Sequence, residues 1–185
     1  MIAKPEWCRA NCPAAKIAQG FAKDSGDPST AVAAFIAEAP GQAEFDQGEA
    51  MVGPTGVYFN GLLDQAGLPR HTVVIANTLR CRFGTNKYPK GQLRKDCEAA
   101  CRHWDTDTLG VFGPTVWAVS YHPAAVFRTP QYEEYLKKAL RLAKSFVDKG
   151  ERPVVLLGDK SLEAFAPWLK GGVGAWKGHW WEDEG

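Results

Sequence analysis

The sequence lacks any run of about eighteen apolar residues, the length that a membrane-spanning helix needs. Its N-terminus, MIAKPEWCRANC, also lacks the continuous apolar stretch of a secretory signal peptide. These two absences argue against a membrane protein, and we expect a soluble, cytoplasmic protein with no membrane partner. Disulfides are rare in that compartment, so the five cysteines are expected to serve another purpose.

The chain also lacks a surplus of charge of either sign, because 22 basic and 21 acidic residues leave a net charge of +1. Net charge therefore gives no argument for nucleic-acid binding. One short segment, residues 80–95, is nevertheless basic and polar. Such a segment can track phosphates, although a solvated surface loop explains it equally well. Its candidates for contact with DNA are Arg82, Lys87 and Lys90.

Four apolar segments predict the strands of a buried parallel sheet, and helical patterns alternate with them. The strands are expected at 31–37, 72–77, 116–119 and 153–158, and the main helices at 57–66, 92–104, 132–147 and 160–169. This alternation predicts an α/β fold, a three-layer αβα sandwich with a mostly parallel four-stranded central sheet. The length favours a single domain, 1–185, and leaves open that it belongs to a larger chain.

Three of the predicted strands lead into polar side chains, which are Glu38, Asn77 and His122. The carboxyl ends of parallel strands share one edge of the sheet, where open α/β folds bind ligands. Gly41 and Gly53 belong to a glycine-rich loop after the first strand, where backbone amides can approach a polar or anionic group. Taken singly, Glu38 and Asn77 are also explained as caps, and His122 as a turn residue before proline.

The cysteines form two groups, because Cys8 and Cys12 lie near the N-terminus and Cys81, Cys97 and Cys101 follow much later. Thiolates are the preferred ligands of both structural zinc and iron–sulfur clusters. Spacing alone does not choose between these two kinds of site.

Several motifs together resemble the iron–sulfur uracil-DNA glycosylases, usually called family four. They are AEAPG at residues 37–41, MVGPTG at 51–56, NTLRCR at 77–82 and YHPA at 121–124. The combination is far more specific than any single motif. The resemblance implies an enzyme that hydrolyses the N-glycosidic bond of uracil, or of a related damaged base, flipped out of DNA. Single-stranded DNA is included among the expected substrates.

The resemblance also implies a [4Fe-4S] cluster held by Cys8, Cys12, Cys81 and Cys97. Fifteen residues separate Cys81 from Cys97, as in the family, whereas three residues separate Cys8 from Cys12 where the family usually has two. Cys101 has no family counterpart, and we interpret it as a small buried residue.

Carried over from the family, Glu38 and His122 are the expected catalytic residues. His122 would donate a hydrogen bond to the base oxygen on which negative charge develops, and Glu38 would orient water or offset the positive charge of the sugar. The Asn77 amide can both donate and accept, so it suits the edge of a pyrimidine. Gly41, Gly53 and Met51 are expected to complete the substrate-binding site.

Two features depart from the family. Met51 stands where the family has a phenylalanine that stacks on the base, and Tyr58 is a weaker aromatic candidate. The strand at 153–158 follows the histidine-proline motif, whereas its family counterpart precedes it, so the C-terminal elements are re-ordered.

These departures keep a second hypothesis open, which is a non-catalytic iron–sulfur domain that binds nucleic acid within a larger replication or repair assembly. A zinc protein unrelated to the glycosylases remains only if the motif matches are accidental. The retained Glu38, Asn77 and His122 favour the enzyme.

Overall fold

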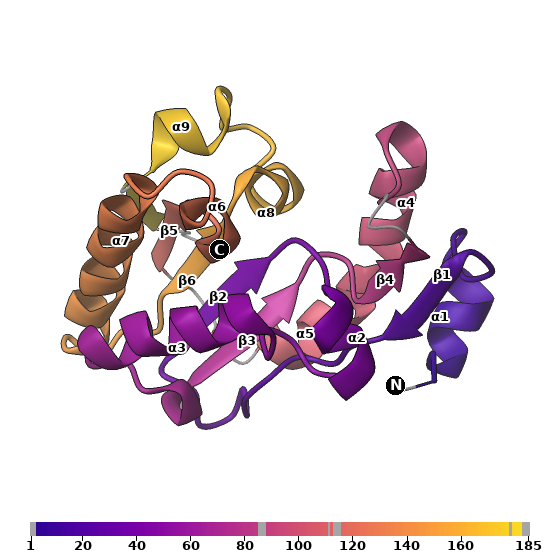
Figure 1. The fold of residues 1–185 in the computed structure, drawn as a ribbon, viewed down its shortest axis with the longest axis horizontal. Coiled ribbons are helices and arrows are strands. Elements are labelled where there is room, and N and C mark those ends of the chain that lie inside the picture. The colour runs from indigo at the N-terminus through magenta and orange to yellow at the C-terminus, as the bar shows by residue number, and fades with distance from the viewer. Residues whose placement is uncertain (1–2, 85–87, 111, 113–115, 178, 183–185) are drawn as a thin grey trace.

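The structure is a computed structural model that describes residues 3–84, 88–110, 112, 116–177 and 179–182. Helices and strands alternate along most of the chain (Figure 1). The elements are α1 (Glu6–Asn11), β1 (Ala18–Phe21), β2 (Ala33–Ala37), α2 (Gln42–Gln47), α3 (Pro54–Gln65), η1 (Arg70–Thr72), β3 (Val73–Asn77), β4 (Cys81–Phe83), α4 (Gly91–Cys101), η3 (Arg102–Trp104), α5 (Asp105–Leu109), β5 (Val116–Ser120), α6 (Pro123–Val126), α7 (Tyr132–Val147), β6 (Val154–Leu157), α8 (Asp159–Phe165), α9 (Gly172–Trp176) and β7 (Trp180–Glu182).

The main sheet has the strand order β3-β2-β6-β5-β7. The first four strands run parallel, and β7 pairs antiparallel with β5 at the edge. The predicted mostly parallel α/β sheet is therefore confirmed, and the four predicted strands are its four parallel strands. The strand that comes last among these four in the chain, β6, lies inside the sheet between β2 and β5.

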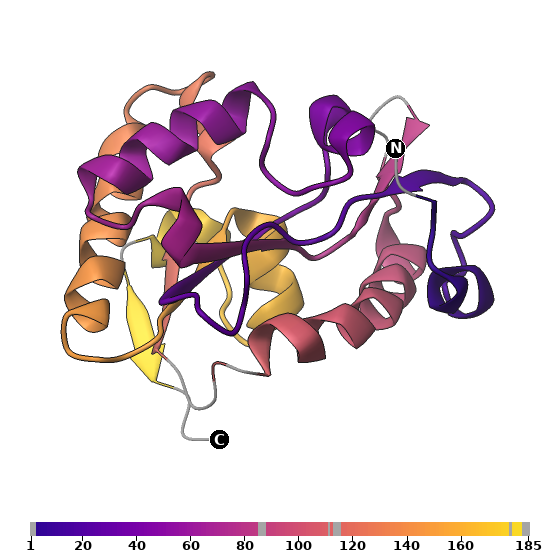
Figure 2. The same ribbon diagram turned by 90° about the horizontal axis from the view of Figure 1, so that it is seen from below.

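Both faces of the sheet are buried, which explains why its strands are continuous apolar runs. Along β2, Phe35 packs with α3 and α7 on one face, and its neighbour Ile36 packs with α8 and α9 on the other. The edge of the Phe59 ring from α3 meets the Phe35 ring, with centroids 5.3 Å apart. Figure 2 shows α3 on one side of the strands and the segment containing α4 and α5 on the other. Helices on both faces make the three predicted layers.

Two crossovers have the same hand. From β2 to β3 and from β5 to β6 the chain moves in the same direction along the sheet, and the connecting helices α3 and α7 pack on the same face. This uniformity is expected of parallel βαβ units.

A smaller structure, here named the cysteine lobe, consists of α1, β1, β4 and α4 and projects from one end of the main sheet (Figure 1). β1 and β4 form an antiparallel pair, and α1 packs against α4. Its apolar cluster is small and is built largely from cysteine and alanine side chains. The sequence analysis missed this two-stranded sheet, because AQGF and CRF are too short and too mixed to form a strand pattern.

The prediction of a four-stranded sheet also missed β7. Its sequence, Trp-Trp-Glu, follows a glycine-rich tail and is only three residues long, so it gives no periodic signal. Trp180 of β7 packs edge-on against Phe146 of α7, with ring centroids 5.3 Å apart.

The predicted helix at 132–147 has the observed bounds. The predicted helix at 92–104 ends at Cys101 and continues as a 3₁₀ turn, and the one at 160–169 ends at Phe165. In the part of the chain that the structure describes, no helix combines the length and the apolar character needed to span a membrane.

Candidate active site

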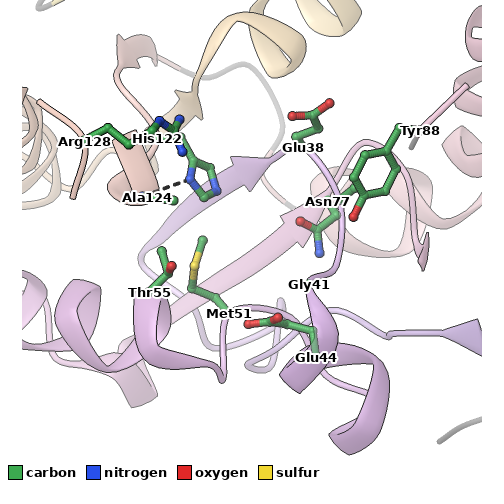
Figure 3. A pocket seen from close by; sticks show the side chains of 11 residues that line it. Glu38, Gly41, Glu44, Met51, Thr55, Asn77, Tyr88, His122, Ala124 and Arg128 are labelled. Carbon is green, nitrogen blue, oxygen red and sulfur yellow. Dashed lines mark hydrogen bonds between the residues drawn. The ribbon is translucent and has the colours of Figure 1, made fainter. Parts of the chain in front are cut away.

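A cavity of about 390 Å³ opens at the carboxyl ends of β2, β3 and β5, and we name it the strand-end cavity (Figure 3). It brings together five of the predicted site residues from four separate parts of the chain. The lining residues are Glu38, Ala39, Gly41, Glu44, Met51, Thr55, Asn77, Tyr88, His122, Ala124 and Arg128. The topology explains this convergence, because parallel strands deliver their last residues to one edge of the sheet.

Asn77 is the last residue of β3 and lies opposite Ala37 of β2 in the parallel register. Its side chain is almost fully enclosed, with 4% exposure, and points into the strand-end cavity (Figure 3). The backbone carbonyl of Asn77 accepts a hydrogen bond from Nη1 of Arg80 at 3.2 Å. The amide is thus presented from a rigid strand end, where it can donate to and accept from a planar ligand.

His122 caps the short helix α6. The backbone N–H of Ala124 donates to Nδ1 of the imidazole at 3.1 Å, so Nδ1 must be unprotonated (Figure 3). Burial lowers the pKa of His122 to about 4, and the positive charge of Arg128 acts in the same direction. At neutral pH the ring is therefore neutral and carries its proton on Nε2, the nitrogen that can donate to a ligand in the cavity.

Glu38 directly follows β2, and its backbone carbonyl accepts hydrogen bonds from Oγ1 of Thr78 at 2.8 Å and from the N–H of Leu79 at 3.0 Å. These bonds lock the ends of β2 and β3 together. The carboxylate is 39% exposed and sits at the rim of the cavity, pointing away from Asn77 (Figure 3). One of its oxygens, Oε1, pairs with Nη1 of Arg94 at 2.8 Å.

Glu44 is a cavity residue that the sequence analysis missed. Its Oε1 accepts hydrogen bonds from the backbone N–H groups of Val52, at 3.1 Å, and Gly53, at 2.8 Å, at the start of α3. The expected role of Gly53 as an amide facing the ligand does not match this geometry, because its N–H is used by Glu44 and it does not line the cavity. A signal did exist in the sequence, since Glu44 is an acid placed between two glycines of the predicted binding loop.

Gly41 does line the cavity, and the reason for glycine there is steric. A Cβ atom at Gly41 would lie 2.7 Å from Oε2 of Glu44, and one at Gly53 would lie 3.1 Å from Oε1 of the same carboxylate. The glycines of this loop therefore make room for the Glu44 carboxylate.

Met51 lies on the floor of the cavity and is 6% exposed. Among the described residues it is the only non-glycine with a positive φ, 55°. Its carbonyl oxygen passes so close to Gly56 that a Cβ there would approach it to 1.9 Å. A strained backbone of this kind persists only where the surroundings enforce it, and such positions cluster at binding sites.

The aromatic ring at this cavity comes from Tyr88, which the sequence analysis did not select. Its hydroxyl donates to the carbonyl of Pro40 at 2.6 Å, and burial raises the pKa of Tyr88 to about 12, so the phenol stays protonated. The earlier candidate, Tyr58, lies elsewhere, where its hydroxyl donates to Glu133 at 2.8 Å. No periodic pattern marks Tyr88, because it lies in the connection between β4 and α4.

The cysteine side chains converge on a second, very small cavity in the cysteine lobe. Its lining contains all five cysteines together with apolar side chains and Lys4. Burial is the main cause that raises the pKa of Cys81, Cys97 and Cys101 to about 12, and neighbouring cysteines add to the shift. Among the described residues, no group of three or more His, Cys, Asp or Glu side chains is arranged as a metal site.

The chemistry of the five cysteine side chains nevertheless suits a thiolate-ligated centre. Several thiols face one another in an apolar enclosure, and a positive metal centre would offset their mutual repulsion once they are deprotonated. Cys101, 7% exposed, faces the same cavity as the four predicted ligands.

The predicted DNA contacts lie in different places. Lys90 lines a broad basin of about 780 Å³ that adjoins the strand-end cavity and shares Glu38 and Tyr88 with it; the basin is also lined by Lys95, Arg94 and Lys160. Arg82 lies outside this basin, where its Nη1 donates to Oε1 of Gln19 at 2.7 Å. Lys87 lies outside the described residues.

Comparison with known proteins gives a consistent result. The family model of the uracil DNA glycosylase superfamily matches residues 24–177, which is most of the chain. The chain is 32% identical over 82 residues to a type-4 uracil-DNA glycosylase of Thermotoga maritima, covering 44% of this chain and 41% of that protein. A type-4 uracil-DNA glycosylase of Archaeoglobus fulgidus is 38% identical over 63 residues, 34% of this chain and 32% of its own length.

A third relative, a type-4 uracil-DNA glycosylase of Pyrobaculum aerophilum, is 29% identical over 103 residues, 56% of this chain and 50% of its own. The chain thus matches half or less of the length of these curated relatives.

Proposed function

Because the chain belongs to the uracil DNA glycosylase superfamily, we propose that it hydrolyses the N-glycosidic bond of uracil in DNA. The observation that carries this proposal is the strand-end cavity, which combines a neutral histidine donor, an enclosed amide and a carboxylate at its rim. Cleavage of this bond leaves a cationic sugar and an anionic base, so a catalyst must stabilise both charges while holding the base.

His122 supports the stabilisation of the base. As the glycosidic bond breaks, negative charge accumulates on the uracil oxygens, and a donor placed there in advance lowers the barrier. The hydrogen bond from Ala124 to Nδ1 leaves Nε2–H free for this role. A neutral donor is suitable, since it strengthens its hydrogen bond as the charge develops and does not need to lose a proton.

Asn77 and the cavity walls support base selection. The amide can pair with one edge of uracil, and Met51 and Tyr88 offer apolar surface to the ring. Stacking of a base on an aromatic side chain contributes about 1 to 3 kcal/mol. Tyr88 therefore compensates in part for the methionine at position 51. Gly41 and Gly53 act through the loop that holds Glu44.

Glu38 is proposed to act at the sugar. The deoxyribose of a captured nucleotide is proposed to lie at the rim, because Asn77, which would hold the base, points into the cavity, whereas the Glu38 carboxylate points away from Asn77 (Figure 3). An ionised carboxylate there can orient the attacking water and offset the positive charge that develops on the sugar.

We further propose that Cys8, Cys12, Cys81 and Cys97 hold a [4Fe-4S] cluster. The cluster would join segments that are distant in the chain and so contribute to the folding of the cysteine lobe. Its support is the convergence of these cysteines on one apolar cavity. No part of the proposed chemistry at the strand-end cavity passes through the cluster.

DNA is proposed to lie across the basin beside the cavity, where Lys90 and Lys95 can contact phosphates. An extruded base then reaches Asn77 while its neighbours stay in the basin. Single strands should be favoured, because no base pairing opposes extrusion. Arg82, which pairs with Gln19, is a weaker candidate than Lys90.

One observation favours a second candidate function, a non-catalytic DNA-binding domain. The thioether of Met51 lacks the flat π-face that stacking requires, so base capture would be weakened. In that case the basin would still bind DNA, but no uracil would be released at the strand-end cavity.

The direct test is uracil release from single- and double-stranded oligonucleotides by iron-reconstituted protein. We expect release from uracil-containing DNA and none from the matched thymine oligonucleotide. The His122→Ala variant should bind the oligonucleotide as well as the wild type. Its rate of uracil release should fall by about a hundredfold or more. DNA binding without any uracil release by the wild type would favour the binding domain.

A further inference from the structure

Arg94 connects the cysteine-bearing helix to the rim of the strand-end cavity. It lies in α4, three residues before Cys97, and its guanidinium bridges two carboxylates. Nη1 pairs with Oε1 of Glu38 at 2.8 Å, and Nε pairs with Oε1 of Glu98 at 2.7 Å. The residue is 8% exposed, so this bridge is largely shielded from water.

The bridge restrains Glu38 in a way that its own backbone does not. The carboxylate of Glu38 is 39% exposed, and an exposed glutamate ordinarily samples several rotamers. Glu98, whose side chain is 12% exposed, fixes the guanidinium on the side away from Glu38. A planar guanidinium that is held at Nε can present Nη1 in a fixed direction, which a flexible lysine cannot do.

Resting on the function proposed above, we infer that Arg94 is a positioning residue that holds the Glu38 carboxylate at the site of the departing sugar. Arg94 contacts Oε1, so the other carboxylate oxygen, Oε2, would be the one available to the attacking water. Without this contact, Glu38 keeps its chemical identity but loses its defined place. A misplacement of about 1 Å in a reacting group can slow a reaction about a hundredfold.

The Arg94→Gln variant should reduce the single-turnover rate constant of uracil release about tenfold to a hundredfold. The rate constant is measured at saturating DNA, because Arg94 also lines the basin across which DNA is proposed to lie. The thermal midpoint and the iron content should stay close to the wild type. The Arg94→Lys variant should recover part of the rate, because an ammonium can still reach one carboxylate. Glu98→Gln is the matched control, since it alters the same guanidinium without touching Glu38, and its effect should be smaller than that of Arg94→Gln.

A double-mutant cycle with Glu38→Gln decides the inference. If Arg94 acts through Glu38, Arg94→Gln should change the residual rate of Glu38→Gln protein by less than about twofold. Equal factors in both backgrounds would overturn the inference and make Arg94 an independent contact. Loss of iron in both Arg94 variants would also overturn it, assigning Arg94 to support of the cysteine lobe.

The two proposals fail differently in this experiment. Wild-type protein that binds iron and DNA but releases no uracil removes the proposed function, and the positioning role of Arg94 with it. Wild-type release with an additive cycle removes only the role of Arg94.

Discussion

The main sheet and the cysteine lobe are built on different principles. The sheet buries apolar side chains on both faces and is closed by helices from two layers. The cysteine lobe has a small cluster in which six of the nine buried side chains are cysteine or alanine and three are large, namely Phe21, Leu79 and Phe83. Burial of apolar area stabilises a structure by about 25 cal/mol per Å². The sheet can therefore supply its own stability, whereas the lobe needs an additional source, which the proposed cluster would provide.

Two buried arginines are among the residues that link the two regions. Arg94 extends from the lobe to Glu38. Arg80, only 1% exposed, pairs with Asp24 at 2.7 Å and Asp105 at 2.9 Å and also donates to the carbonyls of Asn77 and Cys101. The Arg94 contact links the lobe to Glu38 at the end of β2, and the Arg80 contact links it to Asn77 at the end of β3. The comparison thus predicts that damage to the lobe affects the cavity more than the sheet itself.

The largest expected effect comes from removing a proposed ligand. Cys81→Ser should abolish the cluster, because a hydroxyl is a poor substitute for a thiolate. Amide exchange should then accelerate strongly in α1, β1, β4 and α4 while β2 and β6 stay protected. Iron analysis and hydrogen exchange with peptide resolution check this. Equal loss of protection in the main sheet would show that the two regions are not separate.

The opposite perturbation is Leu140→Ala in α7, a fully buried residue of the sheet core. It should lower the free energy of unfolding by about 2 to 5 kcal/mol, because a cavity replaces the side chain. Iron content at moderate temperature should not change. Urea unfolding and iron analysis measure these two quantities. Loss of iron in this folded variant would show that the cysteine lobe is not independent of the main sheet.

A change inside the cavity should have a smaller effect. Tyr88→Leu removes the aromatic surface and should weaken capture of the base about tenfold, through part of the stacking energy. Tyr88→Phe is the matched control, since it keeps the ring and loses only the hydrogen bond to Pro40. Competition between a uracil-containing strand and a uracil-free strand gives the ratio of the two affinities. Equal ratios for the leucine variant and the wild type would exclude stacking by Tyr88.

The smallest effect is expected for Cys101→Ser. Cys101 faces the same small cavity as the other cysteines, but the family pattern that resembles this chain has no ligand there. Iron content and the visible absorption of the anaerobic protein should match the wild type. Loss of iron would make Cys101 a ligand and would remove one of the four proposed cysteines from that role.

The sequence predicted the parts of the molecule that repeat a simple pattern. Continuous apolar runs identified β2, β3, β5 and β6, and the polar residues at or just beyond the ends of three of them, Glu38, Asn77 and His122, lie at one cavity. Their proposed chemical roles remain predictions. The parallel topology makes such inferences possible, because the register of strands fixes where their ends meet.

Features that depend on contacts between distant segments were not predictable in this way. Glu44, Tyr88 and Arg94 lie in a short helix, a connection and a helix face, and only the fold brings them to the cavity and the adjoining basin. The short strands β1, β4 and β7 are defined by their partners rather than by their own residues. Conversely, the expected amide of Gly53 is used by Glu44, a contact that no local pattern reveals.

A pH profile of uracil release tests whether His122 acts as a neutral hydrogen-bond donor. Folding holds the pKa of His122 near 4, below its usual value of 6.5, so the neutral form dominates at pH above about 5. Its protonation becomes favourable only as the pH falls toward 4. We therefore predict that the single-turnover rate constant shows no His122-dependent transition between about pH 5.5 and about pH 8. This range contains the usual pKa of histidine. A rate that changes with a midpoint near 6.5 in the wild type, and does not in His122→Gln, would contradict the claim.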